Sequence, residues 1–302
     1  MAYLDRRQKI TRSFCLMVIL SLLAIFNSNL LNAAELEAQR YVAGMHESVW
    51  GFSGSGVSCE LQHEIPQFGL ARFRRIAGDN LHFLIDSYQP IPEKVEAVLR
   101  EVSPAWEHNE PDSLKQMVVI HSGMRPLQLD RKQAGWLLTS LTKGQLGSFD
   151  FLDWDDSRRQ VQVQLSPVNF QKAYRQFKQC LRQLQNNGLT DYRHTVVHFA
   201  LDVDTPDKQA QQQLNQLAAY IVAEEKINRI MIAGHADDQG GRRYNKRLSA
   251  RRAEHVYRYL SKKGVKQILM TQRHYGESKP KIAKQTEMAR AENRRVKISL
   301  QR

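Results

Sequence analysis

Residues 234–260, GHADDQGGRRYNKRLSARRAEHVYRYL, form the stretch from which the fold and the site can be predicted. A helical wheel of about 100° per residue from Asn245 gathers an apolar stripe on one side. That stripe consists of Leu248, Ala253, Val256, Tyr259 and Leu260. Arg252 falls within it, whereas three other arginines of the helix, Arg247, Arg251 and Arg258, lie on the opposite side. Because a guanidinium stays charged in a protein, an unpaired one on an apolar face is costly, and we expect Arg252 to have an anionic partner.

The Gly-rich loop before this helix holds the nearest candidate partner, Asp237. Asn245 lies on the same helix face as Arg252, two turns earlier. An acid, an amide and a base are therefore expected to converge where a strand ends and a helix begins. Such a set suits a zwitterion, because the carboxylate can bind an ammonium group and the guanidinium can bind a carboxylate. The alternative is an internal salt bridge between loop and helix, and periodicity alone does not decide between the two.

Four spaced motifs in this half of the chain resemble the OmpA-type peptidoglycan-binding domain. They are Asp237-x-x-Gly240, Asn245-x-x-Leu248-Ser249-x-x-Arg252-Ala253, Tyr275-Gly276-Glu277-x-x-Pro280 and Asn293-Arg294-Arg295-Val296. The resemblance implies that Asp237 and Arg252 hold the diaminopimelate of the wall peptide, and that Asn245 and Leu248 line the pocket. Ala236 stands where the family often has a threonine, which predicts a weaker contact.

Residues 1–33 have the pattern of a secretory signal peptide. Four cations precede an apolar run at residues 13–26, which is shorter than the roughly 20 residues of a membrane span. Cleavage is expected after Ala33 or Ala34. We therefore predict a periplasmic mature chain without a transmembrane span, and its length suggests two domains, at 34–188 and 189–302.

Two cysteines remain after the predicted cleavage, Cys59 and Cys180. In an exported protein the simplest expectation is that they form a disulfide, and the alternative is two buried thiols.

Positive charge is concentrated near the C-terminus. The whole chain carries a formal net charge of +13, and residues 191–302 hold 23 Lys and Arg against 12 Asp and Glu. A basic domain can bind nucleic acid, but an exported one rarely meets any, so nucleic acid is not expected as a partner. The cluster Arg242, Arg243, Lys246 and Arg247 could attract anionic wall polymers, or it could be an ordinary solvated face.

The two halves predict an α+β protein overall. The first half reads as an antiparallel β domain: residues 159–165 alternate polar and apolar, and residues 81–85 and 117–120 are further short strands. Ser166 and Pro167 are expected to open a helix that packs on this sheet through Phe170, Tyr174, Phe177, Leu181 and Leu184. In the second half, strands near 195–201, 229–233, 270–275 and 296–300 alternate with helices, which predicts an OmpA-like α/β sandwich.

The first half also resembles the MotY-type family of flagellar T-ring proteins. The similar segments are residues 40–43 (RYVA), residues 59–69 (CELQHEIPQFG) and the helix at 166–180. The resemblance implies an N-terminal domain that joins the flagellar basal body, docks a MotX-like partner and helps recruit the stator, associated with the outer-membrane side of the periplasm. The C-terminal domain would then grip the wall.

Other classes of protein are less consistent with the sequence. An outer-membrane barrel needs repeated alternating segments, and one clear segment is present. A wall enzyme with a metal at His235, Asp237 and Asp238 does not fit known zinc spacings, so no catalytic residue, metal or cofactor is expected. A wall-binding envelope protein unrelated to motility remains the alternative function.

Overall fold

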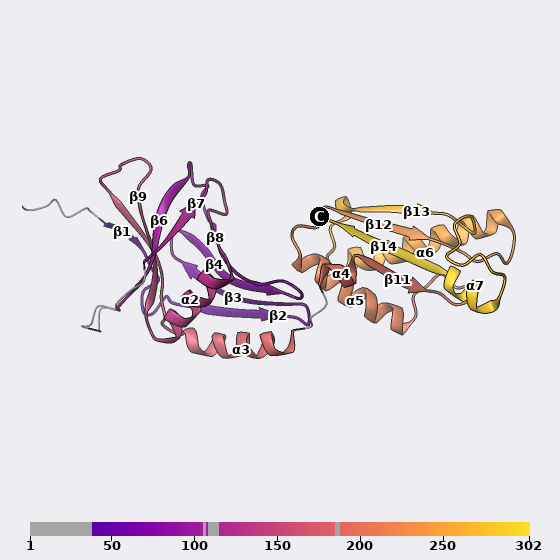
Figure 1. Cartoon of the computed structure of the whole chain (residues 1–302), viewed down its shortest axis with the longest axis horizontal. Helices are drawn as coiled ribbons and strands as arrows, with labels where there is room; N and C mark the ends of the chain where they lie inside the picture. Colours follow the sequence, from indigo (N-terminus) through magenta and orange to yellow (C-terminus); the bar gives the residue numbers. More distant parts are fainter. Residues whose placement is uncertain (1–37, 105–106, 108–114, 185–187) are drawn as a thin grey trace, which may run out of the picture.

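The computed structural model describes residues 38–104, 107, 115–184 and 188–302. The predicted signal peptide lies outside these residues, as do residues 185–187 just before the predicted domain boundary. The two halves follow one another along the long axis of the molecule, with the predicted wall-binding half on the right of Figure 1. The domain boundary near residue 188 stays a prediction.

Two five-stranded sheets build the N-terminal half (Figure 1). One has the order β1 (Ala38–Tyr41), β10 (Gln160–Leu165), β9 (Leu146–Leu152), β6 (Val95–Val102), β7 (Gln116–Ile120). The other has the order β2 (Trp50–Gly54), β3 (Ser58–Ile65), β4 (Gly69–Ile76), β5 (Leu81–Ser87), β8 (Leu127–Leu129). The pairing is antiparallel as expected, except that β1 pairs with β10 in parallel.

A single hydrophobic core joins these two sheets and two helices. Aromatic rings line this core: Phe73 and Phe83, on neighbouring strands of one sheet, lie 4.7 Å apart between ring centroids. Phe83 also stacks on Phe149 of the other sheet, at 5.7 Å between centroids. The helix α2 (Arg131–Thr142) was not predicted from the sequence, and it begins with a capping box between Asp130 and Gln133.

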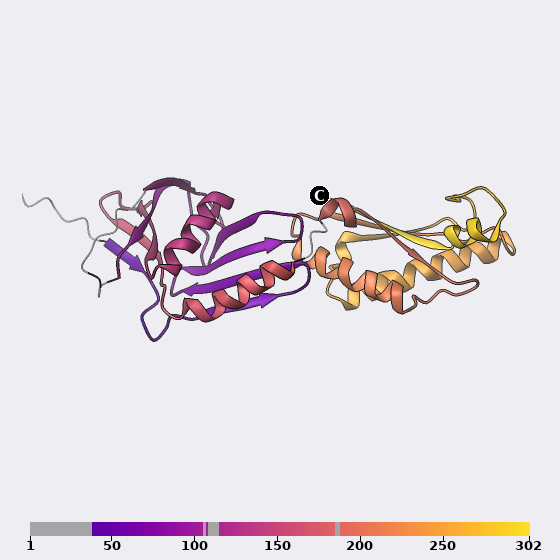
Figure 2. The same ribbon diagram turned by 60° about the horizontal axis from the view of Figure 1, so that its bottom comes forward.

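The helix α3 (Phe170–Gln183) confirms the predicted packed helix, but it begins later than expected. Its N-cap is Asn169, which has φ 61° and makes no side-chain capping hydrogen bond. The Ser166 hydroxyl instead accepts from the amide of Val168, 3.4 Å away, so the prediction that Ser166 caps the helix is wrong. Figure 2 shows α3 lying along the outside of the second sheet.

The strand at 160–165 differs from its predicted one-sided character, because both of its faces are covered. Gln162 and Gln164 are buried. Gln162 accepts a hydrogen bond from Arg40 at 2.8 Å, and Gln164 donates to Ser148 at 3.2 Å. Hydrogen bonding offsets the cost of burying these amides, and the polar alternation therefore did not indicate a solvent face.

The C-terminal half contains one mixed sheet with helices packed against it, as the α/β sandwich prediction requires. The strand order is β11 (His194–His198), β14 (Arg295–Gln301), β12 (Arg229–Gly234), β13 (Met270–His274). The helices are α4 (Leu189–Tyr192), α5 (Lys208–Ala223), α6 (Arg242–Lys262) and α7 (Glu287–Asn293), and Gln267–Leu269 form a 3-10 turn. Among the described residues, no helix is both long and apolar enough to cross a bilayer.

Candidate wall-binding site

The site forms where β12 ends and α6 begins. Gly234, the last residue of β12, lies so close to α6 that a Cβ there would be 2.0 Å from the backbone oxygen of Ser249. The Ser249 hydroxyl in turn accepts from the amide of Gly276, at 2.9 Å. These close contacts fix the loop at 235–241 and the turn after β13 around the first half of α6.

Arg252 is fully buried, with 0% of its surface exposed, although it carries a charge. Its Nε, Nη1 and Nη2 donate to the backbone oxygens of Val203, His235 and Ala200 at 2.8, 3.1 and 3.1 Å. The guanidinium also lies over the ring of Phe199, 5.2 Å from its centroid. Backbone carbonyls therefore hold this side chain, and two of its five N–H donors make no hydrogen bond to a described residue.

Asp237, 5% exposed, pairs with a different arginine from the one expected. Its Oδ2 accepts from Arg294 Nη1 at 3.0 Å, and its Oδ1 accepts from the amide of Gln239 at 3.3 Å. Arg294 is itself buried and also reaches the exposed carboxylate of Glu287 at 3.0 Å. Arg294 belongs to one of the four sequence motifs, but the motif gives it no role, because 57 residues separate it from Asp237 along the chain.

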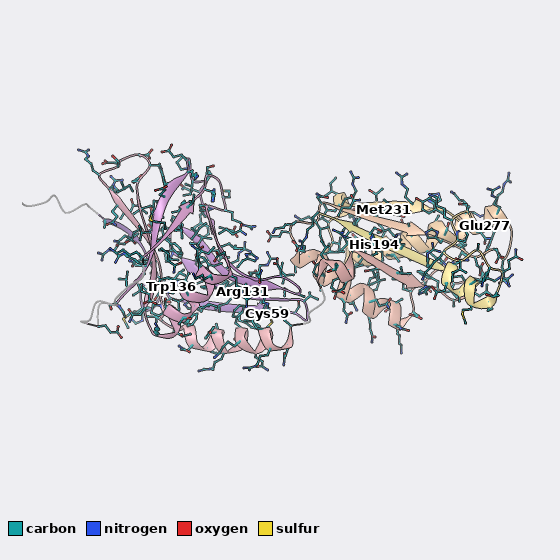
Figure 3. The ribbon with its side chains drawn as sticks, viewed as in Figure 1. Cys59, Arg131, Trp136, His194, Met231 and Glu277 are labelled. Carbon is teal, nitrogen blue, oxygen red and sulfur yellow. A yellow bond between two sulfur atoms is a disulfide. The ribbon has the colours of Figure 1, made fainter. Side chains whose placement is uncertain are left out.

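Asn245 and Leu248 are buried beside these groups, at 1% and 4% exposure. The amide nitrogen of Asn245 donates to the Asp237 backbone oxygen at 3.2 Å and to Glu277 Oε2 at 2.6 Å. Its amide oxygen, by contrast, is buried without a hydrogen-bond donor among the described residues. Glu277 is labelled in Figure 3, at the end of this half remote from the N-terminal sheets.

Positive charge exceeds negative charge among the buried side chains of the site. Two buried guanidiniums, Arg252 and Arg294, face one buried carboxylate, Asp237. Burial lowers the pKa of Arg252 to about 10, and Asp237 opposes this shift, so the side chain keeps its charge at neutral pH. Burial and the nearby charge of Arg295 lower the pKa of His235 to about 4, which leaves that imidazole neutral.

The three side chains that the sequence offers as metal ligands have other contacts. His235 stacks on Tyr275 at 5.3 Å between centroids, and Asp238 pairs with Arg290 at 2.8 Å. The described residues contain no group of three His, Cys, Asp or Glu side chains placed to hold a metal ion.

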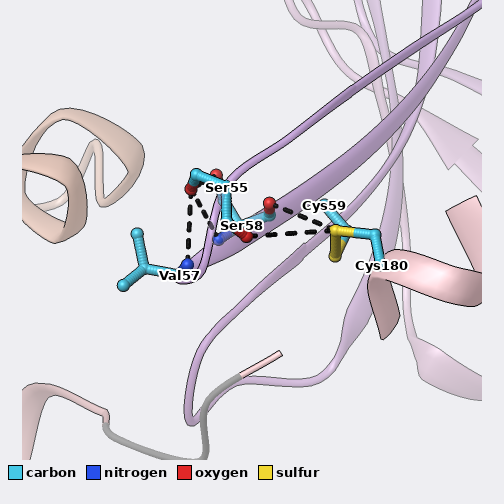
Figure 4. The surroundings of a disulfide bond; sticks show 5 residues. All are labelled: Ser55, Val57, Ser58, Cys59 and Cys180. Atoms are coloured by element: carbon cyan, nitrogen blue, oxygen red, sulfur yellow. Dashed lines mark hydrogen bonds between the residues drawn. A yellow bond between two sulfur atoms is a disulfide. The ribbon is translucent and has the colours of Figure 1, made fainter. Parts of the chain in front are cut away.

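The predicted disulfide is present in the other half of the chain. Cys59 on β3 and Cys180 on α3 are bonded, with their Cα atoms 5.9 Å apart (Figure 4). It ties the last helix of that half to one of its central strands.

Comparison with known proteins gives a family match for each half of the chain. Residues 198–294 match the OmpA family model. The peptidoglycan-associated lipoprotein of Pasteurella multocida is 33% identical over 107 residues, which cover 35% of this chain and 71% of that protein. The crystal structure of the corresponding lipoprotein from Burkholderia pseudomallei shares 34% identity, with a TM-score of 0.34, and the match covers 35% of this chain and 89% of that chain. The C-terminal half is thus an OmpA family domain.

Further matches extend over most of the chain and give its family. Residues 41–185 match the MotY N-terminal domain. The sodium-type flagellar protein MotY of Vibrio parahaemolyticus is 29% identical over 293 residues, 94% of this chain and 96% of that protein. The chain therefore belongs to the MotY family, in which a MotY N-terminal domain is followed by an OmpA family domain.

Proposed function

We propose that this protein is a periplasmic T-ring component of the flagellar motor that anchors the stator region to peptidoglycan by non-covalent binding of the wall peptide. The family membership of both halves supports the motor role and the wall ligand. The protein acts as a binding and structural element, without catalysis.

The main support for the wall-binding role is a group of buried polar side chains at the start of α6 whose charges and hydrogen bonds are not fully matched within the protein. Arg252 has no direct ion pair, and Arg294 shares its charge between the buried Asp237 and the exposed Glu287, so Asp237 is the single buried carboxylate beside two buried guanidiniums. The Asn245 amide oxygen lacks a donor among the described residues. A buried acceptor without a partner is costly, so a ligand that donates to it gains affinity.

Diaminopimelate has the two groups that this set requires. Its free carboxylate would bind the guanidinium side of the site, at Arg252 and Arg294. Its ammonium would donate to Asp237 and to the amide oxygen of Asn245. Leu248 would contact the aliphatic chain between them.

Access to the site requires movement of the loop at 238–241, because the four predicted side chains are at most 5% exposed. The ion pair between Asp238 and Arg290 ties this loop to α7. The loop includes Gly240, with φ 90°, and Gly241, where an added Cβ would meet no atom within 4 Å. We propose that opening this ion pair admits the wall peptide.

The N-terminal domain is proposed to join the basal body and to dock a MotX-like partner. A stator that turns a rotor experiences an equal reaction torque, so its surroundings need attachment to a rigid object, and the covalent wall provides one. The second candidate function is a non-flagellar envelope protein that binds peptidoglycan through the same domain. A swimming assay of a gene-deletion strain distinguishes these two functions. Normal motility with a weakened envelope would favour the non-flagellar function.

Co-sedimentation with isolated peptidoglycan tests the wall site. Asp237→Asn keeps the shape of the side chain and removes the charge that would bind the ligand ammonium. Because a charge-assisted hydrogen bond contributes roughly 1.5–3 kcal/mol, we expect at least about tenfold weaker pelleting. Asp155→Asn, an equal charge change in the N-terminal half, is the control and should pellet normally.

Circular dichroism of both variants shows whether they remain folded. Equal pelleting of folded Asp237→Asn and wild type would contradict the proposed site. It would leave the basic surface of the domain as the source of any wall contact.

A further inference from the structure

The strand β2 has a free edge in the N-terminal half. It lies at the end of its sheet and pairs with β3 alone among the described strands. The amide of Ser55 donates to the backbone oxygen of Ser58 at 2.8 Å, in the register that pairs Trp50 with His63. Since hydrogen-bonded and non-hydrogen-bonded pairs alternate in an antiparallel ladder, the backbone groups of Trp50, Phe52 and Gly54 point away from β3.

The helix α3 packs against β2. Its opposite, exposed face is strongly basic. Lys172, Arg175, Lys178 and Arg182 are all exposed, and the helix contains no acidic residue. At about 100° per residue, these four cations fall within an arc of roughly 120°. None of them forms an ion pair with a described residue, so together they present an unneutralised ridge.

A groove separates the free edge of β2 from this ridge. One hollow of about 640 Å³ is lined by Val49 and Trp50 on the β2 side and by Lys172, Arg175 and Gln176 on the α3 side. A second, of about 360 Å³, lies between Phe52 and Gly54 of β2 and Gln176, Gln179 and Gln183 of α3. Because Gln176 lines both hollows, they are neighbouring parts of one groove.

A disulfide and an aromatic contact hold the two walls of this groove together. Cys180 of α3 lines the second hollow and is bonded to Cys59 on β3, the strand next to β2 (Figure 4). At the other end, Trp50 of β2 packs edge-on against Phe170 of α3, with centroids 4.9 Å apart. The two walls are therefore anchored at both ends and the groove is preorganised for binding.

We propose that the β2–α3 groove is a docking site for an extended acidic segment of a partner protein. The segment pairs its backbone with the outward groups of β2, which adds a strand to the sheet. Its alternate side chains then point toward α3, where carboxylates meet Lys172 and Arg175, the two cations that line the groove. Arginine binds a carboxylate with two parallel hydrogen bonds, which gives the contact specificity as well as affinity.

A protein segment fits this surface better than a membrane does. Helices that lie on membranes insert apolar side chains next to their cations, and the apolar face of α3 is instead buried in the core of the domain. The exposed face consists of glutamines and cations. Backbone hydrogen-bonding groups along β2 further require a partner with a free backbone.

This inference names the docking surface for the partner role in the proposed function, and it rests on that part of it. The test uses a purified protein and a synthetic peptide, so it is independent of wall pelleting. The probe is a capped nine-residue peptide that alternates valine and glutamate. The first control alternates valine and lysine, and the second is the acidic peptide with N-methyl groups on alternate amides along one edge, prepared in both registers.

Binding to the full mature protein is measured by isothermal titration. We expect the acidic peptide to bind, the lysine peptide to show no binding, and one or both N-methylated registers to bind at least tenfold more weakly. The double variant Lys172→Glu and Arg175→Glu should lose binding tenfold or more while its circular dichroism stays unchanged. Lys208→Glu with Lys226→Glu, on the C-terminal domain, is the matched control and should bind normally.

Several outcomes would overturn the proposal. No binding of the acidic peptide at millimolar concentration would mean that the cations only protect a bare edge from pairing. Equal binding of the methylated and unmethylated peptides would mean simple charge attraction without strand addition. Binding of vesicles with anionic phospholipid, in place of the peptide, would mean that the ridge recognises a membrane.

Discussion

Arg252 occupies a core position that ordinarily takes an apolar side chain. Its apolar neighbours on α6, Leu248 and Val256, are buried, as the helical wheel predicts. The wheel also predicts a partner for the charge, but it cannot identify that partner. Three backbone carbonyls from the chain after β11 and β12 fill the role, and Asp237 contributes through space without a direct ion pair.

Arg252→Ala is expected to destabilise the C-terminal domain. The substitution removes three hydrogen bonds from a charged donor and leaves the buried oxygen of His235 without a partner. At about 1 kcal/mol or more for each bond, the free energy of unfolding should fall by roughly 3 kcal/mol. Urea unfolding measures the change. Arg247→Ala, at an exposed position of the same helix, should change it by less than about 0.5 kcal/mol.

Equal stability of these two variants would contradict the structural role of Arg252. The expected loss also explains why Asp237→Asn is the better test of wall binding. A variant that unfolds loses every function of the domain, whatever its role in the site.

At the scale of elements, two glycines differ in the space around them: Gly234 lies where β12 and α6 approach closely, and Gly135 lies in open space. Gly234→Ala places a methyl group against the Ser249 oxygen and forces β12 away from α6, which should cost about 1–3 kcal/mol. Gly135→Ala in α2 meets nothing within 4 Å and should stabilise that helix by about 0.5–1 kcal/mol. Calorimetric melting of the two variants should therefore give shifts of opposite sign, and shifts of the same sign would contradict the close approach.

The disulfide between β3 and α3 is expected to stabilise the N-terminal half selectively. It closes a loop of sequence separation 121, for which the chain-entropy estimate is roughly 4–5 kcal/mol. Reduction should lower the melting temperature of this half and leave the C-terminal half unchanged. Hydrogen exchange with and without reductant measures both halves in one sample, and equal loss of protection in both would show that the effect is not local.

At the scale of the whole molecule, a charged contact joins the two halves. Glu225, just after α5, accepts from Arg74 on β4 and from Arg125 before β8, at 2.7 Å in each case. Burial raises the pKa of Glu225, but the hydrogen bonds from these two arginines outweigh it and lower the pKa to about 2. Val57 and Ala77 from the N-terminal half also belong to the hydrophobic core of the C-terminal half.

Glu225→Gln is expected to loosen this contact between the halves. Because the folded pKa is depressed, the contribution of Glu225 is complete above the usual pKa of 4.5 and disappears as the pH falls through about 2. The variant should melt below the wild type at pH 7, and the difference should shrink toward zero between pH 4.5 and 2.

Calorimetry across this pH range measures the difference, with Glu93→Gln as a control at an exposed position. A difference that stays constant with pH would contradict the assignment. Small-angle scattering at pH 7 adds a second readout, since a looser contact should broaden the distribution of distances in the variant.

The sequence by itself determined the local and covalent features of this protein. Helical periodicity placed the apolar face of α6 and the buried position of Arg252, and the two cysteines of the exported chain indicated their bond. Spaced motifs identified the OmpA and MotY families. These features depend on residues close together in the sequence or on residue types with few chemical options, so one chain is enough to find them.

The tertiary structure alone decided which groups meet across long distances in the chain. It paired Asp237 with Arg294, supplied carbonyls to Arg252 and buried the glutamines of β10. It also placed the free edge of β2 beside the cations of α3. Such contacts arise from the packing of whole elements, and a periodic pattern specifies which face of an element is buried without specifying what lies against it.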